Sequence, residues 1–86
     1  MIDKSEVRKN LREWLQNPSW KEYFEKSPSD LCKDYIALMF YASETEDEEV
    51  FEEMDAMERK LSQEDLKYLY DNAVGPEKAR LAKLIQ

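Results

Sequence analysis

Residues 43–58, SETEDEEVFEEMDAME, contain nine carboxylate side chains and no basic one. Closely spaced carboxylates can bind a divalent cation, transfer protons in catalysis, or form a negative surface that attracts a basic partner. Each use requires different residues around the acids. The spacing within the stretch and the composition of the whole chain therefore distinguish between them.

The calcium hypothesis requires an EF-hand loop, in which oxygen ligands alternate along the chain and a glycine makes the central turn. A loop that starts at Glu44 has Glu49 where glycine is needed and Asp55 at its last position. The chain has no histidine and a single cysteine, Cys32, so it lacks the ligands of zinc and di-iron sites. We expect neither a metal ion nor a cofactor.

Catalysis would need residue types that this chain lacks. Histidine, the commonest general acid or base, is absent. Cys32 has no histidine to activate it, and in an apolar helix its expected role is that of a small buried filler. With one glycine in the chain, no glycine-rich loop can hold a phosphate. We therefore expect a protein that is not an enzyme.

Helices are the elements that must position the acidic residues. Helix starts are predicted at Asn17–Pro18, Ser27–Pro28, Thr45–Glu48 and Ser62–Asp65, and Gly75–Pro76 is expected to end one helix and begin another. Apolar residues recur at helical spacing between these signals, without the period-two alternation of strands. The sequence predicts an all-α fold.

The segment at about residues 29–43 is apolar around most of its girth, which is typical of a central helix. For a chain of 86 residues, one domain spanning residues 1–86 is the natural expectation. We predict a compact bundle of about five to six short helices around the central one.

The environment of the protein is indicated by its apolar runs and its cysteine. The longest apolar run, residues 35–42, is much shorter than the ~20 residues that cross a bilayer. The first residues carry no signal-peptide pattern, and a single cysteine allows no internal disulfide. We expect a soluble, cytoplasmic protein that does not associate with a membrane.

The net charge of −7 belongs to one segment, because residues 43–65 contain eleven acidic and two basic side chains. In a helix there, Val50, Met54, Met57 and Leu61 share the apolar face. A solvated surface helix explains the acids on the other faces, whereas a face of one sign can also steer a basic partner. The second hypothesis assigns partner contact to Glu48, Glu49, Phe51, Glu52, Glu53 and Asp55, with Phe51 as the apolar anchor.

The C-terminal segment NAVGPEKARLAKLIQ, residues 72–86, resembles the helix-hairpin-helix motif, whose GxGxxxA turn binds nucleic-acid backbone. Gly75 and Ala79 match that pattern, whereas Ala73 replaces its first glycine. The resemblance implies phosphate contact through the hairpin of residues 66–86, at Gly75, Lys78, Arg80 and Lys83. Any helical hairpin could use the same glycine and proline, and a net negative charge opposes nucleic-acid binding.

Together these observations predict a small acidic, non-enzymatic protein that binds a protein with a basic surface. Nucleic-acid backbone binding through the C-terminal hairpin is the alternative. The sequence leaves the partner and the oligomeric state open.

Overall fold

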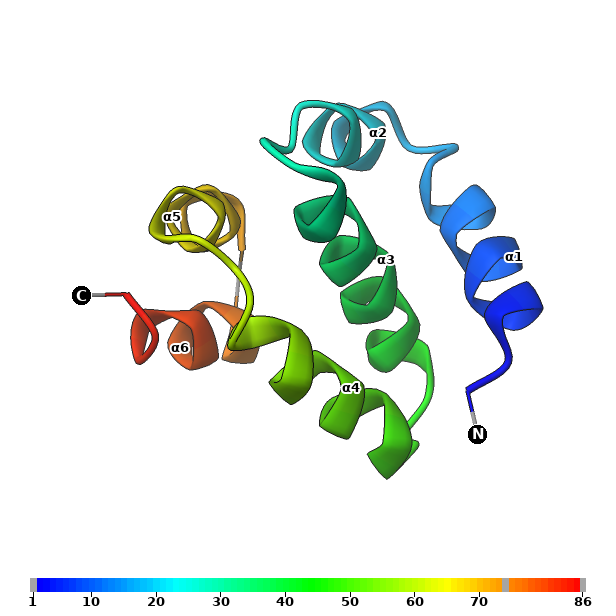
Figure 1. Ribbon diagram of the computed structural model, residues 1–86. Coiled ribbons are helices and arrows are strands. Elements are labelled where there is room, and N and C mark those ends of the chain that lie inside the picture. Colours follow the sequence, from blue (N-terminus) through cyan, green and yellow to red (C-terminus); the bar gives the residue numbers. More distant parts are fainter. Residues whose placement is uncertain (1, 74, 86) are drawn as a thin grey trace.

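The computed structural model describes residues 2–73 and 75–85, which form six α-helices and contain no strand (Figure 1). The predicted all-α fold is confirmed. No helix in the described part of the chain is long and apolar enough to span a membrane. The helices are α1 (Lys4–Trp14), α2 (Pro18–Glu25), α3 (Asp30–Glu44), α4 (Glu48–Glu58), α5 (Gln63–Asn72) and α6 (Pro76–Ala82).

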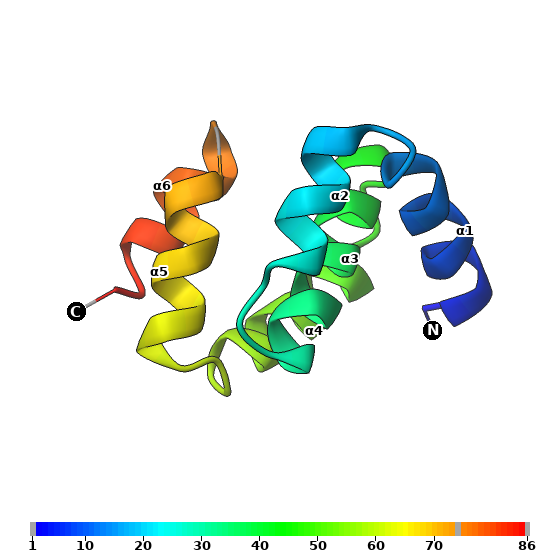
Figure 2. The ribbon, with the colours of Figure 1, turned by 90° about the horizontal axis from the view of Figure 1, so that it is seen from above.

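The predicted central helix is α3, which packs against α1, α2, α4 and α5, while α6 packs against α5. Figures 1 and 2 both show α3 between α1 on one side and the α5–α6 pair on the other. Cys32, Tyr35 and Ile36 on α3 are fully buried. A helix that is apolar around its girth can hold this position because it has neighbours on several sides.

The apolar stripe of α4 faces the core as predicted. Val50 and Met54 are fully buried, and Met57 and Leu61 are nearly so. Leu69 on α5 is also fully buried. On α6, Leu81 is buried, but Ala79 and Ala82 are exposed because α6 has a single neighbour in strong contact, α5, and presents a narrow face to it.

Two predicted helix starts are confirmed. Asn17 caps α2 by accepting a hydrogen bond from the Ser19 backbone N–H at 2.9 Å, and Pro18 is the first residue of that helix. Ser62 and Asp65 form a reciprocal capping box at the start of α5.

The predicted start at Ser27 is wrong, because Ser29 caps α3. The Ser27 hydroxyl donates to the Phe24 carbonyl and so belongs to the end of α2. Ser29 accepts from the Cys32 N–H at 3.1 Å and donates to the buried Asp65 at 2.9 Å. The hydrogen bond to Asp65 on α5 therefore supports Ser29 as the cap, which the local pattern did not predict.

The predicted start at Thr45 is also wrong. Thr45 ends α3, since its N–H donates to the Tyr41 carbonyl, and Asp47 caps α4 by accepting from the Glu49 N–H at 2.9 Å. Side-chain contacts with α1 extend α3 to Glu44, where Glu44 accepts from the Trp14 indole at 3.0 Å.

Gly75 begins a helix but does not end one, contrary to the prediction. Helix α5 already ends at Asn72, with Ala73 as its extended C-cap. Gly75 occupies the N-cap of α6 at φ 64, and a Cβ built there would meet no atom within 4 Å. The glycine is therefore required by its backbone angle rather than by lack of space.

Candidate functional site

Helix α4 carries all six predicted partner-binding residues and divides most of them between two flanks. Its apolar face is buried against the core, which leaves one flank toward α6 and the other toward α1. Phe51, Asp55 and Glu58 are spaced by four and three residues and so share the flank toward α6. Glu49, Glu52 and Glu53 line a groove on the other flank.

The carboxylates on the flank toward α6 are paired with a cation of the same chain, Arg80. Glu58 accepts from Arg80 Nε at 2.7 Å and from the Tyr35 hydroxyl at 3.1 Å, and its side chain is 8% exposed. A second Arg80 nitrogen pairs with Asp55. Burial alone would lower the pKa of Arg80, but the hydrogen bond and charge of Glu58 raise it. This flank therefore stabilises the contact between α4 and α6.

Phe51 lies beside that ion-pair cluster. It is 37% exposed and is the one large apolar side chain classed as exposed in the described part of the chain. It does not line the groove on the opposite flank. The predicted anchor and the groove-lining acids therefore face different directions.

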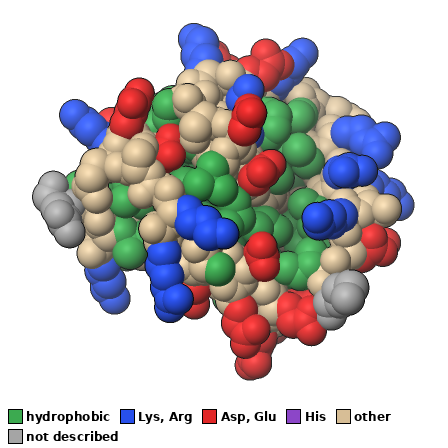
Figure 3. All heavy atoms as spheres, viewed as in Figure 1, with side chains coloured by type: hydrophobic (Ala, Val, Ile, Leu, Met, Phe, Trp, Pro, Cys, Tyr) green, Lys and Arg blue, Asp and Glu red, His purple; other side chains and the backbone are tan. Residues whose placement is uncertain are grey.

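The groove lies between α1 and α4 and has a volume of about 1030 Å³. We call it the α1–α4 groove. Its floor is aliphatic, and its two edges carry opposite charges, from α1 on one side and α4 on the other. Figure 3 shows hydrophobic side chains on this face between basic side chains at the α1 edge and acidic ones over α4. The floor includes Val7, Leu11, Leu31, Leu38 and Met57.

Lys4 and Arg8 form the basic edge, and Glu49, Glu52 and Glu53 form the acidic edge. Lys4, Arg8, Glu52 and Glu53 are all exposed, and none of these four forms an ion pair with another described residue. The charges of these four side chains are therefore available to an external molecule. Lys60 and Asp34 also line the groove.

Sequence reasoning missed the contribution of α1 and α3 to this surface. The signal was present in part, because Val7 and Leu11 share a helical face and Lys4 and Arg8 are four residues apart on the same helix. Nothing local in the sequence brings that helix beside α4. Of the predicted residues, Glu48 is exposed at the start of α4 outside the groove.

The predicted nucleic-acid contacts lie at and beyond the start of α6. Gly75 and Lys83 are exposed, whereas Lys78 lies over the Tyr70 ring at 4.7 Å from its centroid. Arg80 is held between Asp55 and Glu58. Two of the three predicted cationic side chains, Lys78 and Arg80, therefore make contacts within the chain.

Cys32 is fully buried on α3. Burial raises the pKa of its thiol to about 12, and the charge of Asp65 adds to the rise. A thiol with so high a pKa stays protonated at neutral pH and is a poor nucleophile. The side chain fills space in the core, as its position in an apolar helix predicts.

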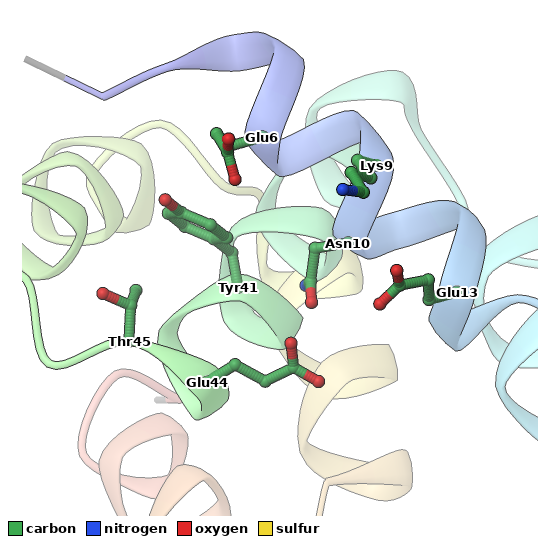
Figure 4. A pocket seen from close by; sticks show the side chains of 7 residues that line it. All are labelled: Glu6, Lys9, Asn10, Glu13, Tyr41, Glu44 and Thr45. Atoms are coloured by element: carbon green, nitrogen blue, oxygen red, sulfur yellow. The ribbon is translucent and has the colours of Figure 1, made fainter.

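A second hollow, of about 340 Å³, lies between α1 and the end of α3 (Figure 4). Its centre is Asn10, which donates to Glu44 and accepts from the Tyr41 N–H at 3.2 Å when its amide is oriented to satisfy both groups. Glu44 also accepts from Trp14, so this polar cluster joins α1 to α3. Within the described residues, no group of three cysteine or carboxylate side chains is arranged to hold a metal ion.

Comparisons of the chain with protein-family models, with curated proteins and with solved structures give no match.

Proposed function

We propose that this chain is a small non-enzymatic module that acts in the cytoplasm by binding another protein. The docking surface is the flank of α4 that faces the α1–α4 groove, and the partner carries basic side chains. The observation that carries the proposal is the position of Glu52 and Glu53, two carboxylates without an ion pair to another described residue, along the edge of an aliphatic groove.

Two physical arguments support this surface over a purely solvated helix. Like charges close together on a helix repel each other, and neither Glu52 nor Glu53 gains an ion pair with a described residue in return. The neighbouring groove places partly exposed Val7, Leu11 and Leu31 next to that charge. Apolar area in the same groove as an acidic helix edge is a combination that gives both affinity and a fast, steered association.

The structure changes one part of the hypothesis drawn from the sequence. Phe51 and Asp55 lie on the flank toward α6, where Asp55 is paired with Arg80. We therefore assign partner contact to the groove edge, and treat Phe51 as a separate surface whose contribution is tested on its own.

The test is an affinity capture from cell lysate with three folded baits. The native chain is compared with Glu52→Lys/Glu53→Lys and with Glu64→Lys/Asp71→Lys, which makes the same charge change on exposed residues of α5. Circular dichroism confirms that all three baits are helical. The proposal predicts a protein that the native chain and the α5 variant retain and that the α4 variant loses.

Equal retention by all three baits would contradict the proposal, and so would equal loss from both variants, because that result reports net charge alone. A Phe51→Ser bait shows whether the flank toward α6 contributes. Nucleic acid retained more strongly by both charge variants than by the native chain would favour the alternative function at the C-terminal hairpin.

A further inference from the structure

The α1–α4 groove has a shape and a lining that restrict what can occupy it. The two helices on its edges are each eleven residues long, which corresponds to about 16 Å at 1.5 Å per residue. The floor comes mainly from α1 and α3 and is aliphatic, with no aromatic residue in the lining. The groove is thus an open trough along the surface of a helical layer.

Of the common ways in which a protein segment is recognised, one fits this trough. Addition of a strand needs a free sheet edge, and the described residues form no strand. Recognition of a proline-rich segment uses a groove lined by aromatic side chains, and the α1–α4 groove has none in its lining. An amphipathic helix inserts its apolar stripe into an aliphatic groove between helices, and eleven residues of helix match the length of the edges.

The charges on the two edges define the flanks of that helix. Glu52 and Glu53 would face one side of the bound helix, and Lys4 and Arg8 would face the other. None of these four side chains forms an ion pair with a described residue. Resting on the proposed function, we infer that the α1–α4 groove binds an amphipathic helix of a partner protein, with Lys or Arg on the flank beside α4 and Asp or Glu on the flank beside α1.

A second copy of this chain does not supply such a helix. The apolar faces of its amphipathic helices are packed inward, and Phe51 is the one large apolar side chain classed as exposed in the described residues. One exposed ring offers no stripe with helical spacing. A partner with an unpaired amphipathic helix supplies both the stripe and the charges.

The test uses designed peptides of about 18 residues, long enough to cover the trough with a turn to spare at each end. The first has a leucine stripe with Lys on one flank and Glu on the other. The second has the same composition and stripe, with Lys and Glu alternating on both flanks. Their binding to the ¹⁵N-labelled chain is followed by two-dimensional NMR, which gives the dissociation constant and maps the amides that shift.

The expected result is that the first peptide binds about tenfold more tightly than the second, since only it pairs both edges of the groove. The shifted amides lie in α1, α3 and α4 around Val7, Leu31 and Glu52. The protein variant Glu52→Gln/Glu53→Gln loses most of this preference. The variant Glu64→Gln/Asp71→Asn keeps it, because its neutralised residues lie on α5.

Three results would overturn the inference: equal affinity for the two peptides, shifts that map outside the groove, or no binding at peptide concentrations up to about 1 mM. A dimer in sedimentation experiments, with the groove amides protected by self-association, would overturn it in favour of a second copy. Each of these results leaves the proposed function intact if the lysate capture still depends on Glu52 and Glu53. Loss of that dependence overturns the proposed function separately.

Discussion

The two flanks of α4 both carry carboxylate side chains, but these side chains have opposite environments. Toward α6, Asp55 and Glu58 are paired with Arg80 inside the chain. Toward α1, Glu52 and Glu53 lie along an open groove without an ion pair to a described residue. The acids of this helix thus lie in two different environments: on one flank they are held in contacts within the chain, and on the other they contact the partner under the proposed function. Five variants test that separation, from the largest expected effect on stability to the smallest.

Arg80→Met removes the cation that compensates the nearly buried Glu58. A buried carboxylate without a cation destabilises the folded state, so we expect the free energy of unfolding to fall by about 2–4 kcal/mol in urea denaturation at neutral pH. Lys83→Met is the matched control, an exposed cation at the end of the same helix. It should change stability by no more than about 0.5 kcal/mol.

The pair itself is tested by adding Glu58→Gln to Arg80→Met. The double variant should recover much of the lost stability, because the second change removes the stranded charge while Gln can still accept from Tyr35. Additive losses would mean that Arg80 stabilises the chain by packing rather than by charge.

Asp55→Asn removes the outer partner of Arg80. Its side chain is 58% exposed, and exposed ion pairs contribute little, so we expect a loss of about 0.5 kcal/mol in the same denaturation experiment. A loss as large as that of Arg80→Met would show that the outer contact, rather than Glu58, holds α6 against α4.

Glu77→Gln tests the charges around Arg80 through the pH dependence of stability. Burial raises the pKa of the Glu77 carboxyl from its ordinary 4.5; Arg80 opposes the rise and Glu58 adds to it. An acid whose pKa is higher in the folded state contributes stability below its ordinary pKa and loses it as the pH rises through the folded value. The variant should therefore melt slightly above the native chain at pH 7.

The same melting experiment at pH 4 supplies the control for Glu77. There the native carboxyl is largely protonated in the folded state, so the two melting temperatures should coincide. A difference that persists unchanged at pH 4 would show that the substitution acts through packing or helix propensity and not through the charge.

Glu52→Gln/Glu53→Gln should have the smallest effect on stability. Neither residue forms an ion pair with a described residue, and less repulsion along the helix should raise the free energy of unfolding by at most about 0.5 kcal/mol. The same variant should lose partner binding. Marked destabilisation with unchanged binding would reverse the roles that we assign to the two flanks.

The sequence predicted the helices and the buried faces well because both depend on local spacing. The stripe from Val50 to Leu61 is buried where it was expected, and α3 is the central helix. Helix boundaries were predicted less well. The local pattern placed the start of α3 at Ser27, whereas Ser29 is the cap and also donates a hydrogen bond to Asp65, 36 residues further along the chain.

The candidate site was predicted in part for the same reason. The acidity of α4 is visible in the sequence, and so is the position of Phe51 beside it. The groove is not visible, because its basic edge and most of its floor come from α1 and α3. Sequence spacing alone grouped Phe51 and Asp55 with Glu52 and Glu53, whereas the packing of α1 and α6 on either side separates them.

By itself, the sequence determined that this chain is helical, which face of each major helix is buried, and that its negative charge is concentrated in one segment. These properties follow from residue type and from a helical repeat that spans a few residues. The tertiary structure alone decided which acids are paired with Arg80 and which lie along an open groove. Arg80 pairs with carboxylates 22 and 25 residues away, and such a choice depends on how the helices pack rather than on any local pattern.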